Sequence, residues 1–138
     1  MYIGIDFGTT NSGAAYFDGT RVHLVPLDAA SLDPVVMRSV LYITRDHEVY
    51  LGKEAIDAYY RQNVGRPSKM VRQWVGEVEM TFAEIGTFVR DVYVMVDELT
   101  PGRLLRSLKS ELATSYEGTS IFGQHYGLEE LIALFLRR

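Results

Sequence analysis

The chain contains no cysteine, which excludes disulfide bonds, thiolate nucleophiles and zinc–thiolate sites. It also lacks any run of about 18 apolar residues, so no membrane-spanning helix is predicted. Its first residues show no basic region followed by an apolar run, and we therefore expect no secretory signal and a cytoplasmic protein. Basic residues are not in surplus, with 14 Lys and Arg against 18 Asp and Glu. This balance argues against nucleic acid as a partner.

The 138 residues suffice for one domain, and a composition of 47% hydrophobic and 23% charged residues is ordinary for a globular protein. Strand-like residues at 2–7, 13–17 and 21–25 predict three strands joined by tight turns. The dipeptide Asp18-Gly19 is a strong hairpin signal between the last two. The sequence therefore predicts an antiparallel meander, and the strand at 2–7 is expected to be largely buried.

The region that follows the meander predicts a loop, a hairpin and a helix. Residues 28–38 have the composition of a loop, and residues 40–43 and 48–51 resemble the two strands of a hairpin. After Gly52, apolar residues recur at helical spacing until Gly65. We expect one helix to begin just after the second strand of this hairpin.

The middle of the chain, 70–98, alternates apolar and polar residues in two runs. Valines at 92, 94 and 96 alternate with other residues, and the turn between the runs is expected at 84–87. This period of two predicts a long β-hairpin rather than a helix. One face of it is expected to be solvated, and its acidic residues are Glu77, Glu79, Asp91 and Asp97. Trp74 is expected to pack in a core, and a partner-binding patch with Tyr59, Tyr60 and Met70 is the alternative.

Two helices are predicted in the last third of the chain. Pro101 suits the first turn of a helix, and an apolar stripe follows it, made of Leu104, Leu105, Leu108 and Leu112. The second helix begins at Leu128, where acidic residues in the first turn favour the helix dipole.

The segment 3–12, Ile-Gly-Ile-Asp-Phe-Gly-Thr-Thr-Asn-Ser, is the most informative part of the sequence. It places the carboxylate of Asp6 at the end of a strand, followed by a turn of small residues in which Gly8 permits close approach of the backbone. Backbone N–H groups and the hydroxyls of Thr9 and Thr10 would suit a phosphate, and Asp6 would suit Mg²⁺. The same residues also suit a plain hairpin turn. The dinucleotide-binding and P-loop patterns are both absent.

This segment resembles the first phosphate-binding loop of the 70-kDa heat-shock (DnaK-like) chaperones, within the actin and sugar-kinase superfamily. The run Gly-Thr-Thr-Asn-Ser at 8–12 is typical of the chaperone branch. The resemblance implies an α/β fold, a ribonuclease-H-like actin-type ATPase lobe. The resemblance further implies that residues 1–138 form one partial nucleotide-binding domain, the first lobe only. This domain would contain the meander, the flanking helices and a hairpin inserted within 63–100. Residues 53–100 would form its adjoining subdomain.

The same resemblance assigns roles to individual residues. Gly8, Thr9, Thr10 and Asn11 match the residues that bind the β- and γ-phosphates of ATP, and Asp6 matches the carboxylate that organises the hydration shell of Mg²⁺.

A second similarity lies at 103–110, Arg-Leu-Leu-Arg-Ser-Leu-Lys-Ser, which resembles the segment that carries the family's catalytic lysine. Lys109 matches that lysine, which positions the attacking water and the γ-phosphate. Lys53, Lys69 and Arg72 remain rival candidates, because the inserted residues at 63–100 leave the alignment open. Residues 122–136 resemble the strand and helix that follow the lysine in the family.

The resemblance covers only the front of the family's nucleotide-binding domain. It implies an N-terminal fragment of a chaperone ATPase whose full-length form binds client peptides and co-chaperones, with ATP and Mg²⁺ as cofactors. We expect the fragment alone to be nearly inactive, and its unpaired strands favour self-association. A sugar or carboxylate kinase of the same superfamily and a non-catalytic interaction or filament module are the alternatives.

Overall fold

The computed structural model describes residues 1–84 and 86–137. Contacts divide the chain into unit 1, Met1–Val64 with Pro101–Arg138, and unit 2, Gly65–Thr100. The structure is a mixed α/β fold with mostly antiparallel sheets and few helices, which confirms the expected class at that level. The finer assignment to an actin-type lobe stays a prediction, as does the expected subdomain over 53–100.

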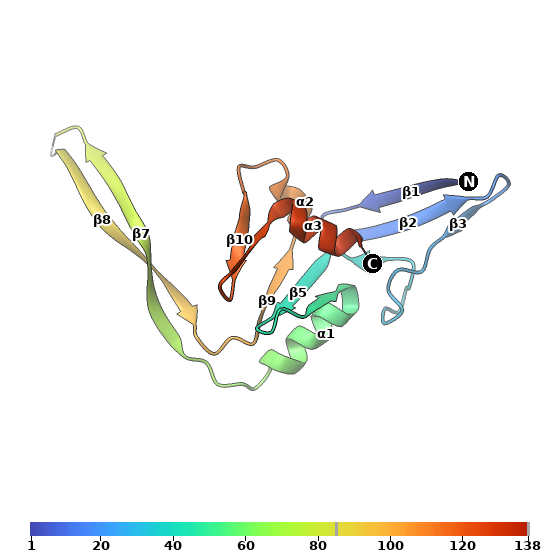
Figure 1. Ribbon diagram of the computed structural model, residues 1–138, viewed down its shortest axis with the longest axis horizontal. Helices are drawn as coiled ribbons and strands as arrows, with labels where there is room; N and C mark the ends of the chain where they lie inside the picture. The colour runs from blue at the N-terminus through green and yellow to red at the C-terminus, as the bar shows by residue number, and fades with distance from the viewer. Residues whose placement is uncertain (85, 138) are drawn as a thin grey trace. The chain divides into compact units, whose positions relative to one another are not determined.

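Unit 1 contains nine of the strands and all three helices that the structure describes (Figure 1). Among the described residues, no helix has the length and apolar character needed to cross a membrane. The strands are β1 (Tyr2–Phe7), β2 (Asn11–Phe17), β3 (Val22–Leu24), β4 (Met37–Arg38), β5 (Val40–Thr44), β6 (Val49–Leu51), β9 (Gly102–Arg106), β10 (Gly118–Ile121) and β11 (Gln124–Gly127). The helices are α1 (Gly52–Asn63), α2 (Leu108–Glu111) and α3 (Leu128–Leu136).

The first sheet confirms the predicted meander. Its central strand β2 pairs antiparallel with β1, β3 and the short strand β4, which forms at the end of the predicted loop 28–38. At the β2–β3 turn, one carboxylate oxygen of Asp18 accepts the backbone N–H groups of Thr20 and Arg21, at 2.7 and 2.8 Å. This arrangement satisfies two donors that the tight turn would otherwise leave unpaired.

The prediction that the strand at 2–7 is largely buried was wrong. In β1, the side chains of Ile3 and Ile5 are 67% and 65% exposed. Only the end of the strand is covered, where the ring of Phe7 lies 5.6 Å from that of Phe135 in α3. An apolar strand sequence indicates that a face suits burial, but it does not supply the element that covers the face.

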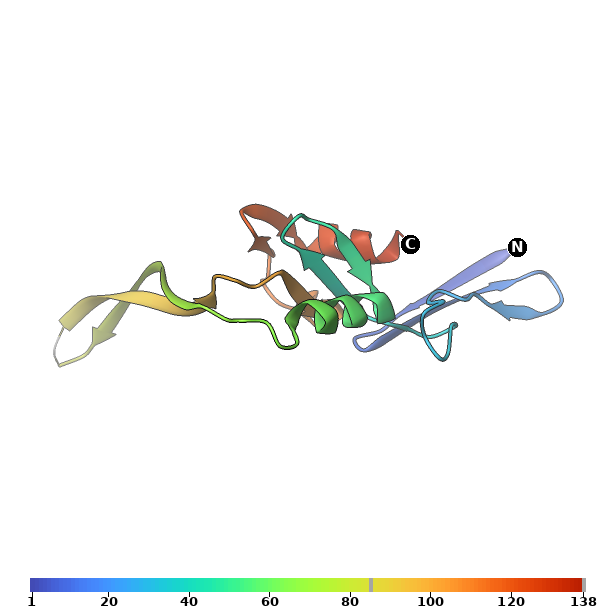
Figure 2. The ribbon, with the colours of Figure 1, turned by 90° about the horizontal axis from the view of Figure 1, so that it is seen from below.

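The core of unit 1 surrounds the second sheet, in which β5 lies between β6 and β9. Successive side chains of a strand point to opposite faces. Leu41 and Ile43 therefore face the larger core with α3, whereas Tyr42 faces α1. All three are fully buried. Figure 2 shows α1 and α3 on opposite sides of this sheet. The hairpin predicted at 40–51, the helix after it and the helix from Leu128 are thereby confirmed.

The predicted helix after Pro101 was wrong over residues 102–106, which form strand β9, and helix is present only in the short α2 that follows. The spacing of its two leucines also fits a strand, with Leu105 in the larger core and Leu104 packed against the cluster around Tyr42. Gly102 lies so close to Tyr42 that an added Cβ would be 2.4 Å from the ring. Pairing with β5, some 60 residues earlier, decides the conformation, and local spacing does not show that partner.

Unit 2 is the predicted hairpin, formed by β7 (Met70–Phe82) and β8 (Gly86–Asp97). The expected turn at 84–87 includes Ile85, which lies outside the described residues. The register places the four acidic residues named above on one face, called here the acidic face. The other is the valine-rich face, formed largely by Val78, Met80, Phe88, Val92, Val94 and Val96. Trp74 lies on the acidic face and is 55% exposed, so its expected place in a core was wrong.

Candidate phosphate-binding site

The turn between β1 and β2 is shaped by Gly8. A Cβ built on this residue would lie 2.2 Å from the carbonyl oxygen of Asn11, far closer than such atoms approach in proteins. Any other residue at position 8 would therefore push the two ends of the turn apart. Glycine at this position allows Gly8, Thr9 and Thr10 to form a narrow loop between the strands.

The far side of this loop is fixed to β4 and to the residue that follows it. The backbone N–H of Ser39 donates to the carbonyl of Thr10 at 2.9 Å. The hydroxyls of Ser12 and Ser39, both buried, share a hydrogen bond of 2.8 Å. Asn11 also pairs with Arg38 in the β2–β4 ladder. These contacts hold the loop in place from one side only.

The donor groups of the loop remain available. In the part of the chain that the structure describes, the N–H groups of Gly8, Thr9 and Thr10 donate to no backbone or side-chain acceptor. The side chains of Thr9, Thr10 and Asn11 are exposed and make no hydrogen bond within the same residues. Successive unpaired N–H groups in a turn form a concavity that suits an anion. The loop therefore fits the phosphate-binding role that the resemblance implies.

Asp6 lies one residue before the end of β1, opposite Gly13 of β2, and its side chain is exposed. Because side chains alternate along a strand, Asp6 points to the face opposite Phe7, and thus away from α3. The described residues contain no group of three or more His, Asp or Glu side chains arranged to hold a metal ion. Mg²⁺ often uses one or two carboxylates together with water and phosphate oxygens, so a single aspartate beside a phosphate loop is compatible with it.

Lys109 lies on α2, directly after β9. The chain turns there through Ser107, whose φ of 61° is in the left-handed region. The lysine side chain is exposed and forms no ion pair with any described residue. Its ammonium group is therefore available for a ligand.

The structure does not join Lys109 to the loop by any hydrogen bond or ion pair among the described residues. The link between them is indirect, because Phe7 precedes the loop and contacts Phe135 of α3, and α3 packs against α2 (Figure 1). Asp6, Gly8, Thr9, Thr10 and Asn11 thus lie together at one end of β1 and β2. Lys109 belongs to the same unit.

The three rival cations are engaged elsewhere. Lys53 lies 2.5 Å from Asp57 one turn further along α1, and Lys69 lies 2.5 Å from Glu98 in unit 2. The guanidinium of Arg72 lies 3.8 Å from the centre of the Tyr93 ring, in a cation–π contact. These contacts favour Lys109 over its rivals, because an existing partner must be given up before a ligand is bound.

Two of the three histidines form a hydrogen bond with another side chain. His23 lies 2.6 Å from Asp18, and hydrogen bonding, chiefly from a backbone N–H three residues on, holds the pKa of that carboxyl below its usual value. His47 shares a hydrogen bond of 2.9 Å with the hydroxyl of Tyr126, whose pKa is raised mainly by burial. Both pairs stabilise local structure and lie outside the loop.

No local sequence pattern indicates Asp28, a fully buried carboxylate in unit 1. One of its oxygens accepts the backbone N–H of Lys53 at 2.7 Å and so caps the start of α1, and the other has no partner among the described residues. Gly52 allows this approach, because a Cβ there would lie 2.4 Å from the bonded oxygen. Asp28 lies 25 residues before the Lys53 N–H that it accepts, beyond the reach of local capping rules.

Comparisons with protein-family models, with curated proteins and with solved structures gave no match to this chain.

Proposed function

We propose that this chain is the N-terminal part of the nucleotide-binding domain of a DnaK-like chaperone ATPase, with the loop at Gly8–Asn11 as its first phosphate-binding element. In the full-length protein, ATP binding and hydrolysis would drive the binding and release of peptides. The observation that carries the proposal is the loop itself. Its narrow shape depends on Gly8, it is fixed from one side, and its donors are unused within the described residues.

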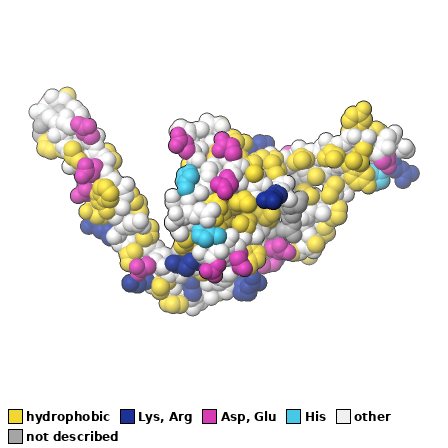
Figure 3. Space-filling view, viewed as in Figure 1, with side chains coloured by type: hydrophobic (Ala, Val, Ile, Leu, Met, Phe, Trp, Pro, Cys, Tyr) yellow, Lys and Arg dark blue, Asp and Glu magenta, His cyan; other side chains and the backbone are white. Residues whose placement is uncertain are grey.

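The exposed first sheet supports the proposal that further protein completes this lobe. Ile3 and Ile5 are about two-thirds exposed, and β1 pairs with β2 alone among the described strands. Figure 3 shows hydrophobic side chains on the surface of this sheet. Apolar strands of this kind are normally covered by another element. The second half of a nucleotide cleft would provide such a cover.

Phosphoryl transfer to water requires positioning of the reactants and neutralisation of charge more than covalent catalysis. Each residue of the proposed site would contribute to one of these two requirements. The loop N–H groups and the two threonine hydroxyls would hold the β- and γ-phosphates. Bound Mg-ATP would supply the phosphoryl group that is transferred to water. Asp6 would accept hydrogen bonds from the waters of the metal, and Lys109 would donate to the γ-phosphate and orient the attacking water. Removing one such preorganised donor typically raises the barrier by about 2.7–4 kcal/mol.

The proposal is tested by calorimetry and phosphate release with the 138-residue chain, the Lys109→Ala variant and a Gly8→Val variant. We expect weak, Mg²⁺-dependent binding of ATP that Gly8→Val abolishes, and negligible turnover, because the proposal assigns only part of the nucleotide cleft to these residues. Complete absence of ATP binding to the folded chain would overturn the proposal. Rapid turnover lost in Lys109→Ala would support the role of the lysine and contradict the proposal that the chain is only part of the site.

One observation favours a second candidate, an interaction module that does not hydrolyse ATP. The hairpin of unit 2 exposes apolar side chains, including Val78 and Phe88 at 47% and 49%, that no other described element of its own unit covers. Such a surface suits a protein partner. The same calorimetry separates the two candidates, because a pure interaction module has no need to bind Mg-ATP.

A further inference from the structure

The outer edge of β8 is a long, uninterrupted strand edge. Over its twelve residues, β8 pairs with β7 and with no other described strand, so its other side forms an edge of the two-stranded sheet. The strand contains no proline or lysine, the residues that commonly protect such edges. The edge of β7 differs, because a bulge at Val75 shifts its register between Trp74 and Gly76. Of the two edges, β8 is the better template for a further strand.

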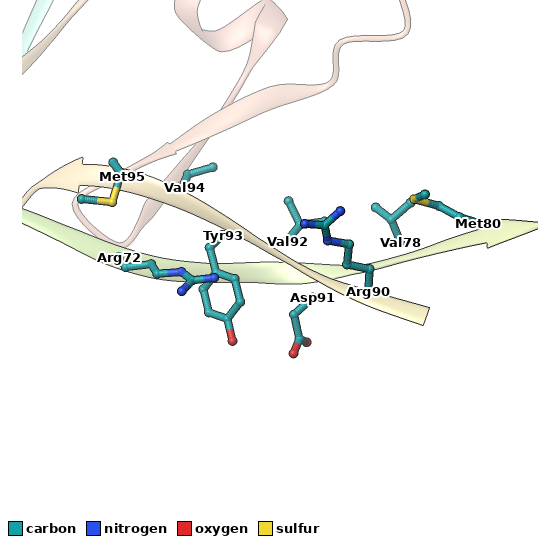
Figure 4. A pocket seen from close by; sticks show the side chains of 9 residues that line it. All are labelled: Arg72, Val78, Met80, Arg90, Asp91, Val92, Tyr93, Val94 and Met95. Carbon is teal, nitrogen blue, oxygen red and sulfur yellow. The ribbon is translucent and has the colours of Figure 1, made fainter. Parts of the chain in front are cut away.

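A shallow groove of about 550 Å³ lies against β8 (Figure 4). Six consecutive residues of β8, 90–95, line it. The lining takes side chains from both faces of β8, together with Arg72, Val78 and Met80 of β7. None of the predicted nucleotide-binding residues lines it.

The hairpin has a physical reason to gain strands. A two-stranded hairpin is marginally stable in water, and three or more strands with an apolar face are needed for independent stability. On the valine-rich face, Val78, Phe88 and Val94 remain 41–49% exposed. A second hairpin added along β8 would produce a four-stranded sheet from two identical halves.

We propose that β8 is the docking edge for a second copy of this chain, paired antiparallel about a two-fold axis at Val92. This register pairs eleven residues, 87–97, and places Phe88 opposite the second copy's Val96 on the valine-rich face. Aromatic and β-branched residues form favourable cross-strand pairs. A two-fold axis at residue 90 would place the Arg90 side chains of the two copies opposite each other, and an axis at residue 91 would do the same with the two Asp91 carboxylates. An axis at residue 93 would pair fewer residues of β8. The inference does not rest on the proposed nucleotide binding.

Charge complementarity supports a second copy as the occupant. In this register Asp91 lies opposite the second copy's Tyr93. Within that second copy, the guanidinium of Arg72 is stacked over the ring of Tyr93. One oxygen of Asp91 accepts the indole N–H of Trp74 at 2.9 Å, and the other has no partner among the described residues. Each aspartate therefore meets a guanidinium across the axis, and the two-fold repeats the contact.

Cysteine crosslinking tests the register directly, because the chain has no native cysteine. In Val92→Cys, the two-fold brings the equivalent Cα atoms to about 4.5–5.5 Å, within the range that a disulfide needs. Val78→Cys is the matched control on the same face of β7. Three strand spacings alone would separate the two copies of this residue by about 14 Å, and the offset along the strand increases the distance, because Val78 lies opposite Arg90 rather than Val92. We expect mild oxidation to crosslink Val92→Cys at least tenfold faster. Equal rates for the two variants, or no crosslinking of either, would overturn the proposal.

A charge swap tests the same pairing without cysteine. Asp91→Arg and Arg72→Asp should each weaken the dimer by about tenfold in sedimentation equilibrium, and the double variant should restore it. Glu79→Arg makes the same charge change on the acidic face of β7 and should leave the dissociation constant unchanged. A monomer up to several hundred micromolar, equal effects of Asp91→Arg and Glu79→Arg, or no rescue by the double variant would each refute the register.

Discussion

Replacing Gly8 with alanine tests the geometry of the loop independently of any ligand. The new Cβ would lie 2.2 Å from the carbonyl oxygen of Asn11, so the two atoms must separate by about 1 Å to reach an ordinary contact. The carbonyl cannot simply move away, because Asn11 is paired with β4 and the neighbouring Thr10 carbonyl accepts the N–H of Ser39. Overpacking of this kind costs about 1–3 kcal/mol, which for a chain of this size lowers the melting temperature by roughly 3–10 °C.

Gly4→Ala is the matched control, with the same chemical change in the same strand. Nothing lies within 4 Å of a Cβ at position 4, so its stability should remain unchanged or rise by up to about 1 kcal/mol. Both variants are compared with the parent chain by urea unfolding and by calorimetric melting. Should Gly8→Ala prove as stable as Gly4→Ala, the tight loop that supports the phosphate-binding proposal does not exist.

Three further predictions concern the scaffold. Gly102→Ala should lower the free energy of unfolding by about 1–3 kcal/mol in urea titrations, because its Cβ would overlap the buried ring of Tyr42, and an unchanged midpoint would contradict that packing. Asp28→Ala should cost about 1–2 kcal/mol in the same assay, because it removes the cap of α1, and no loss would show that the cap contributes nothing. The backbone N–H of Lys69, together with a nearby guanidinium, lowers the pKa of Asp97 from 3.8, so this carboxylate stabilises the hairpin base above pH 4. That contribution should fall as the pH drops through the lowered pKa, seen as faster amide exchange at the base, and an Asp97→Asn variant with the same acid response would refute the assignment.

Local patterns predicted the elements that depend on short-range features. The alternation around Val92, Val94 and Val96 identified the long hairpin and its two faces, and the register bears this out. The dipeptide Asp18-Gly19 identified a turn whose hydrogen bonds to the Asp18 carboxylate are present. In these cases the physical cause lies within a few residues of its effect, so the sequence displays it.

The errors arose where a distant partner decides the outcome. The spacing of Leu104 and Leu105 fits an apolar stripe on a helix. These residues nevertheless form a strand that pairs with β5, and Gly102 allows this pairing because it fits against the ring of Tyr42. The apolar residues of β1 predicted burial, but most of their surface meets no other element. Asp28 caps a helix that begins 24 residues later, and no local rule connects the two. Tertiary partners of this kind are invisible to periodicity.

In the candidate site, too, the sequence predicts the locally determined loop but not the position of Lys109, which depends on tertiary packing. The motif at 3–12 was sufficient to predict a narrow turn with available donors, because Gly8 and its neighbours create that turn among themselves. The position of Lys109 depends on how α2 packs against α3, and the sequence motif carries no information on that packing. The assignment of the lysine therefore rests on the resemblance and on its lack of a competing partner.

The most direct test of the phosphate-binding loop is an amide-resolved NMR titration of the chain. Mg-ATP and inorganic triphosphate are each added in steps, and adenosine serves as the control without phosphate. The account predicts that the amides of residues 8–11 shift with both phosphate ligands and stay unchanged with adenosine. Shifts located elsewhere, or an equal response to adenosine, would contradict it.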